Sequence, residues 1–132
     1  MLDTNTCVNY IRFGPASKVT PRLAAAPPGS VFLCSVVVGE LLYGAYHSLP
    51  PHQAANLAPV GTFRAGFGSL PMDDAAADQY GRLRAHLAGT GQLIGPNDLL
   101  SAAIALANGL ILVTHNTKEF SRAPGLPLED WV

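Results

Sequence analysis

Short apolar runs alternate with longer segments of helical spacing along this chain. Residues 31–34 (VFLC) follow a Pro-Pro-Gly turn and are typical of a buried strand. Ser35 comes next and is expected to cap the following helix. Residues 110–114 (LILVT) are almost continuously apolar, which predicts a central strand of a parallel sheet. A short last strand is expected within residues 126–132, and an unusually short first strand ends at Leu2.

The intervening segments predict helices over residues 36–49, 73–89 and 97–109, although the three valines at 36–38 also suit a strand. The third of these is apolar nearly all round, so it should be buried. Residues 50–60 are bounded by prolines and are predicted to begin as a turn. Strands that alternate with helices predict one α/β domain over residues 1–132, built as a sandwich with a central, mainly parallel sheet.

Composition restricts how this domain meets its partners. Apolar residues make up 48% of the 132 residues, charged residues only 13%, and the formal net charge is −1. Such a low charged fraction favours an apolar surface that is partly covered by a partner. A protein that holds nucleic acid through overall charge would be basic, so any phosphate contacts here must be local.

The two cysteines predict a reducing environment. Cys7 and Cys34 form no CxxC motif and no disulfide framework, and the amino terminus does not resemble a signal peptide. The apolar stretch over residues 99–113 is too short and too interrupted to cross a membrane. We therefore expect a cytoplasmic protein with no membrane segment.

Two acidic residues stand in positions that a purely structural protein would not require. Asp3 directly follows the first strand, where a carboxylate can either cap the next helix or serve a site. Glu40 falls on the apolar face of its predicted helix, where an unpaired carboxylate would cost about several kcal/mol. A hydrogen-bonded or snorkelling Glu40 is the structural alternative to a functional one.

Three further polar residues belong to the same edge of the predicted sheet. Asp98 lies in the first turn of the buried helix, where it can favour the helix dipole, although Asn97 is already available as a cap. Asn116 and Glu119 follow the strand at 110–114 and can be a plain polar loop. Parallel strands bring such residues together beyond their carboxyl ends, and sparse oxygen ligands of this kind suit Mg²⁺.

The sequence lacks the residue patterns that several other classes of enzyme require. The four histidines are scattered and no His/Cys spacing suggests zinc, while no phosphate-binding glycine loop and no nucleophile elbow is present. The haloacid-dehalogenase-like phosphatases also begin with an Asp after the first strand. Their second acid and hydroxyl are replaced here by Asn5 and Cys7.

Four segments, in order and spacing, resemble the PIN-domain family, and within it the VapC-type toxins of type II toxin–antitoxin systems. They are LDTN, SVVVGELLYGA, PNDLLSAAIA and LVTHNTKEFSRAPGLPLEDW. The resemblance implies a PIN-like three-layer α/β/α sandwich and an Mg²⁺- or Mn²⁺-dependent endoribonuclease. It also implies an RNA substrate, a cognate antitoxin and a toxin homodimer.

The resemblance assigns the metal-binding acids to Asp3, Glu40 and Asp98. Where the fourth motif usually has an acid, this chain has the neutral Asn116, and Glu119 is the nearest acid that can substitute. A catalytically silent PIN scaffold that serves protein binding or antitoxin/DNA-complex regulation therefore stays as the alternative. Residues beside the motifs are candidates for RNA contacts: Asn5, Arg12, Thr114, Lys118 and Arg122. For the three basic residues, an ordinary solvated charge is an equal alternative.

Overall fold

The computed structural model describes all residues, 1–132, and is α/β. Its helices are α1 (Thr4–Phe13), α2 (Val19–Ala25), α3 (Ser35–Tyr46), α4 (Pro50–Arg64), α5 (Asp74–Gly89), α6 (Pro96–Ala107) and α7 (Thr117–Phe120), with a 3₁₀ turn at Gly14–Ala16. Its strands are β1 (Phe32–Cys34), β2 (Gly68–Leu70), β3 (Leu112–Val113) and β4 (Leu128–Glu129).

The strands form one parallel arrangement that is completed by the start of the chain. β1 pairs with β2, and β3 pairs with β4, both in parallel. Residues 1–3 lie between the two pairs, because Leu2 N–H donates to Phe32 O at 2.9 Å and Asp3 N–H donates to Val113 O at 2.9 Å. The resulting order is β2, β1, residues 1–3, β3 and β4.

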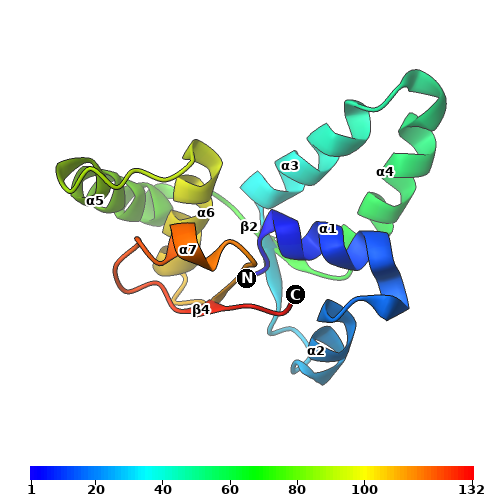
Figure 1. The fold of residues 1–132 in the computed structure, drawn as a ribbon, viewed down its shortest axis with the longest axis horizontal. Helices are drawn as coiled ribbons and strands as arrows, with labels where there is room; N and C mark the ends of the chain where they lie inside the picture. The colour runs from blue at the N-terminus through cyan, green and yellow to red at the C-terminus, as the bar shows by residue number, and fades with distance from the viewer.

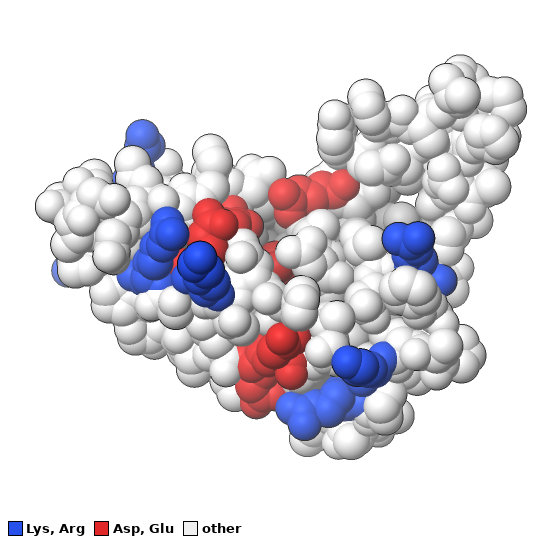
Figure 2. Space-filling view, viewed as in Figure 1, with Lys and Arg blue, Asp and Glu red and all other residues white.

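Helices cover both faces of this sheet and give the three-layer sandwich that the sequence predicts. α3 and α4 form a hairpin that projects from the body, while α5 packs on α6 on the other side (Figure 1). The core lies between these layers and includes Leu2, Leu33, Ile104, Leu112 and Phe120, all of them fully buried. The surface is hollowed between these two arms (Figure 2).

Several predicted elements are confirmed. β1 lies within the predicted 31–34, and α5 runs to Gly89 with Asp73 accepting a capping hydrogen bond from Ala76 N–H at 2.9 Å. The apolar helix is buried along most of its length, as its composition predicted. The short last strand is present as β4. No helix has the length and apolarity to cross a membrane.

Two predicted caps are wrong. α3 is preceded by Cys34 in extended conformation, and Ser35 is already its first residue. α6 begins at Pro96 with Gly95 as its N-cap, so Asn97 lies inside the helix. Proline suits the first helical position because it has no N–H to leave unpaired and its φ is already helical.

Other boundaries also differ from the prediction. Residues 50–64 are helical as α4, since a proline pair is tolerated in a first turn, and residues 117–120 form the short helix α7. β3 is shorter than 110–114 because α6 ends in a Schellman motif. Gly109 has a φ of 62°, and Leu110 N–H donates back to Ala105 O at 3.0 Å instead of joining the strand ladder.

Candidate active site

Acidic side chains gather in the hollow above the sheet, between the α3–α4 hairpin and the α5–α6 pair (Figure 2). They come from the segments that follow strands or begin helices. Asp3 follows the first strand segment, Glu40 lies on α3, Asp98 is in the first turn of α6, and Glu119 is on α7. None of the four forms a salt bridge.

Asp3 is held at the floor of this hollow. It is 4% exposed, and its Oδ2 accepts a hydrogen bond from Thr114 Oγ1 at 2.8 Å. Although Asp3 occupies the N-cap position of α1, its side chain makes no capping hydrogen bond. Burial raises the pKa of Asp3, the Thr114 hydrogen bond opposes this, and the charge of Glu40 raises it further. The backbone N–H groups of Thr4 and Asn5 also lower the pKa of Asp3, so the start of α1 contributes to the setting of this carboxylate.

Glu40 is half-buried and joins three helices through its two oxygens. Asn97 Nδ2 on α6 donates to Glu40 Oε1 at 3.0 Å, and Thr4 Oγ1 on α1 donates to Oε2. The carboxylate on the apolar side of α3 is thus hydrogen-bonded, which offsets its desolvation. Asn97, expected as a helix cap, instead orients Glu40.

Asp98 and Glu119 form the other side of the site. A Cβ atom built on Gly95 would lie 3.6 Å from Asp98 Oδ2 and 3.7 Å from Glu119 Oε1. Gly95 N–H donates to Glu119 Oε1 at 2.8 Å. Asn116 Nδ2 donates to Glu119 Oε2 at 3.1 Å and lies 3.5 Å from Asp98 Oδ2. Asn116 therefore bridges the two acids.

The pKa values of Asp98 and Glu119 are shifted in opposite directions. The pKa of Asp98 is raised to about 6, first by burial and then by the charges of Asp3, Glu119 and Glu40. The pKa of Glu119 is lowered, first by the Gly95 N–H and then by the Asn116 amide. Perturbed acids that repel one another in a hollow are typical of functional sites.

The donor set is chemically suited to Mg²⁺ or Mn²⁺. No three or more His, Cys, Asp or Glu side chains are placed so that together they could hold a metal ion, so the structure has no closed metal-binding cage. Mg²⁺ does not require such a cage, because it keeps several waters and binds through one or two carboxylates together with substrate phosphates. The mutual repulsion that raises the pKa of Asp98 is the electrostatic setting that a divalent cation relieves.

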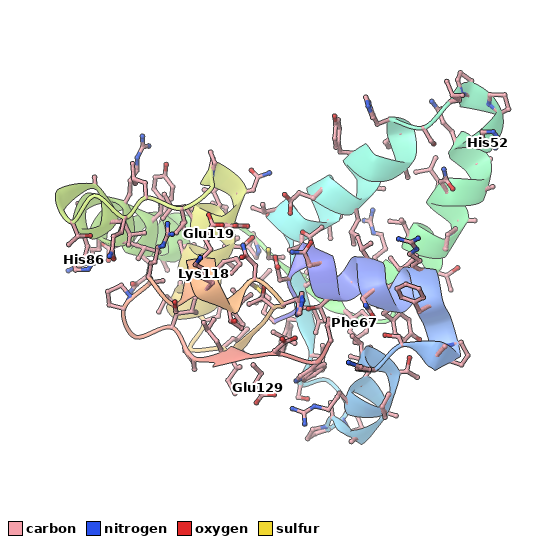
Figure 3. All side chains as sticks on the ribbon, in the orientation of Figure 1. His52, Phe67, His86, Lys118, Glu119 and Glu129 are labelled. Carbon is pink, nitrogen blue, oxygen red and sulfur yellow. The ribbon has the colours of Figure 1, made fainter.

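The remaining predicted contact residues divide into buried and exposed ones. Thr114 is fully buried and supports Asp3 from below, so its hydroxyl does not reach the surface where RNA would lie. Asn5, Arg12, Lys118 and Arg122 are exposed. Lys118 lies beside Glu119 (Figure 3), and Arg12 lines a hollow together with Glu40. The exposed four thus remain candidates for RNA contacts.

Three supporting residues were missed from the sequence: Thr4, Gly95 and the amide of Asn97. Thr4 adjoins Asp3, so its position in the LDTN segment was the available signal. The Gly-Pro pair at 95–96 also marks the turn whose N–H holds Glu119. Nothing along the chain indicates that Asn97 meets a residue 57 positions away.

Comparison with known proteins identifies the class of fold. The PIN domain model matches residues 1–126, so the chain belongs to the PIN-domain family. A structure of DNA-bound VapBC from Salmonella typhimurium superposes with a TM-score of 0.93 at 39% identity, covering 100% of this chain and 97% of that one.

Two relatives narrow the class. The tRNA(fMet)-specific endonuclease VapC of Shigella flexneri is 44% identical over 131 residues, covering 99% of this chain and 96% of that protein. The protein of the same name from Salmonella typhimurium is 40% identical over the same shares. Within the PIN family, the chain is thus a toxin endoribonuclease of the VapC type.

Proposed function

We propose that this single PIN domain hydrolyses one phosphodiester bond of a tRNA in the presence of Mg²⁺ or Mn²⁺. The observation that carries the proposal is the group of four acids without an ionic partner, which converge on one hollow from α1, α3, α6 and α7. The two VapC relatives at 44% and 40% identity are named for initiator tRNA, which makes it the first substrate to test.

Each acid has a role that follows from its surroundings. Asp3, Glu40 and Asp98 would supply the carboxylate ligands, with the oxygen of Asn116 as a further neutral ligand; one or two of these carboxylates suffice for an ion that keeps waters and phosphate oxygens. A bound ion supplies charge neutralisation at the scissile phosphate and a more acidic water. Thr114 and Asn97 keep Asp3 and Glu40 in place, as supporting hydrogen bonds do at metal sites.

Glu119 is the fourth acid of this site. Its lowered pKa keeps it ionised at neutral pH, and Gly95 N–H and Asn116 fix both of its oxygens. A carboxylate that is held this firmly is suited to orienting the attacking water. Arg12, Lys118 and Arg122 would meet the RNA backbone around the acids, which by themselves repel it.

A protein partner would regulate this site. We propose a cognate antitoxin that covers the hollow and a toxin that forms a homodimer. Support comes from large apolar side chains that remain exposed, including Val8 at 46%, Phe13 at 50% and Leu49 at 71%. We place the reaction in the cytoplasm, where the unpaired Cys7 and Cys34 stay reduced.

The test is cleavage of purified initiator tRNA by the purified protein, followed on a denaturing gel across Mg²⁺ and Mn²⁺ titrations. We expect one discrete cut that EDTA abolishes and added metal restores. Elongator tRNAs serve as matched substrates. A protein that binds an antitoxin but cuts none of these RNAs at any metal concentration would favour the silent scaffold instead.

A further inference from the structure

A second hollow adjoins the acids on the side of α3. Its volume is about 480 Å³, within the range of pockets that hold small ligands. Its lining includes Glu40 and Asn97 from the site already described, together with Ser35, Gly39, Tyr43 and Leu100. The hollow is therefore continuous with the acidic site and open to whatever substrate that site receives.

Tyr43 presents an aromatic ring to this hollow. It lies one helical turn after Glu40, and 65% of it is exposed. Its ring stacks on the ring of His47, with centroids 5.2 Å apart and planes inclined by 23°. The histidine ring lies against the tyrosine ring, and the exposed part of Tyr43 leaves ring surface available to a planar group.

The charge of the protein explains why such a face is useful. The net charge is −1, and four carboxylates line the site that an RNA strand must approach. Phosphate contacts alone work against that repulsion. A stacked base contributes about 1–3 kcal/mol without any need for positive charge, because every base has a π-face. Asn97 and Ser35 add polar groups that can meet the base edge.

We infer that Tyr43, supported by His47, forms a stacking platform for an unpaired RNA base next to the cleaved bond. This inference rests on the proposed RNA-cleaving function and extends it to the substrate class. It selects single-stranded or loop RNA, because a base within a duplex cannot turn its face to a side chain. Tyr43 is thus a binding residue that no part of the catalytic chemistry requires.

Gly39 makes the same hollow accessible. It lies four residues before Tyr43 on α3, and a Cβ atom placed on it would meet nothing within 4 Å. A Cβ atom is therefore accommodated here, and a larger side chain would extend from it at the lining of the hollow while favouring the helix over glycine. This gives a second variant that is independent of the tyrosine ring.

The experiment measures binding of a fluorescently labelled single-stranded RNA oligonucleotide by anisotropy, with the protein carrying Asp98→Asn to prevent cleavage. We expect Tyr43→Leu to weaken binding about 10-fold, within the range for loss of one stacked base. Tyr43→Phe should stay within about twofold because it keeps the ring. Gly39→Leu should weaken binding while the melting temperature is equal or higher.

Tyr46→Leu is the matched control, since Tyr46 is on the same helix and 58% exposed but does not line the hollow. Equal losses for Tyr43→Leu and Tyr46→Leu, unchanged binding by Tyr43→Leu, or no binding of single-stranded RNA would overturn the inference. So would sedimentation data in which Tyr43→Leu turns a dimer into a monomer, because the ring would then belong to an interface between copies.

Wild-type cleavage of tRNA, measured separately, distinguishes the two proposals. If RNA is cut but binding does not depend on Tyr43, the platform is wrong and the nuclease proposal stands. If binding depends on Tyr43 but no metal condition gives cleavage, the platform stands and the proposed reaction is wrong.

Discussion

The nine acidic residues of this chain fall into groups with different surroundings. Asp78, Asp130 and Glu129 are each paired with a basic side chain, at 2.8 Å to Arg82, 3.0 Å to His115 and 2.8 Å to Arg22 respectively. Asp73 and Asp74 begin α5. Asp3, Glu40, Asp98 and Glu119 have no ionic partner and share one hollow. Figure 3 shows how far Glu119 lies from the paired Glu129.

This difference in pairing separates the acids that stabilise the fold from those whose charge is balanced only by a bound ion. Each paired acid has a basic partner within the protein, and for Glu129 and Asp130 hydrogen bonds from their neighbours lower the pKa. The pKa values of Asp3 and Asp98 are raised, first by burial and further by the charges of neighbouring acids, whereas Glu119 relies on neutral hydrogen-bond donors. Their repulsion costs stability, and at neutral pH a bound cation would remove it. Variants in the two groups should therefore separate activity from stability.

Asp98→Asn should have the largest effect on activity. We expect cleavage to become undetectable, because the ion loses a ligand, while the metal-free melting temperature stays equal or rises, because a repelling charge is gone. Gel assays and thermal melts measure the two effects. A large fall in melting temperature would show instead that Asp98 chiefly supports the start of α6.

The same variant has a predictable pH dependence. The folded pKa of Asp98, about 6, lies above the ordinary aspartate value of 3.8, so the folded state binds the proton more tightly. Ionised Asp98 therefore destabilises the metal-free fold increasingly as pH rises from about 4 to 6. The advantage of Asp98→Asn should be greatest at about pH 7 and vanish below about pH 4, as thermal melts across that range would measure.

Glu119→Gln tests the charge of the fourth acid with little change of shape, because glutamine can still accept from Gly95 N–H. We expect a loss of about 10²-fold in cleavage at limiting metal, the scale for a group that orients the attacking water. The gel assay is run across Mg²⁺ and Mn²⁺ titrations. Near-wild-type cleavage at limiting metal would leave Asn116 as the fourth member of the site.

Asn97→Ala removes a hydrogen bond that supports Glu40 but replaces none of the four acids. We expect the metal concentration for half-maximal cleavage to rise about 10-fold, the lower end for loss of a supporting hydrogen bond, with the rate restored at high Mg²⁺. Asn97 also lines the hollow beside Tyr43, so RNA affinity is measured in parallel. A loss that added metal does not rescue would contradict the positioning role.

Glu129→Gln should give the smallest effect on activity and a change in stability alone. It removes the ion pair with Arg22, and the expected cost is at most about 1 kcal/mol for a pair this exposed. The pKa of Glu129 is lowered in the folded protein, first by the Trp131 hydrogen bond, so the stabilisation is present at neutral pH and disappears on acidification below about 4.5. Impaired RNA cleavage by Glu129→Gln would contradict the proposal that the paired acids act only in stability.

Periodicity and motif spacing by themselves determined much of this protein. The alternation of apolar runs and helical segments predicted a parallel α/β sandwich, and the order of four short motifs indicated the PIN family. Both are local properties, since a buried strand must be apolar and a helix must repeat about every 3.6 residues. Glu40 was recognised because it interrupts such a pattern, Asp3 and Asp98 because they stand at a strand end and a helix start, and Glu119 because it is the acid nearest to the fourth motif.

The tertiary structure alone decided how these acids are held. Thr114 meets Asp3 across 111 positions and Asn97 meets Glu40 across 57, and no periodicity encodes either contact. Asn97 looked like a cap because its residue type favours that position, but Pro96 fixed the helix start one residue earlier. The pKa of Asp98 depends likewise on three charges from three other segments. Local propensity sets the elements, whereas electrostatics and hydrogen bonding act through space and require the fold.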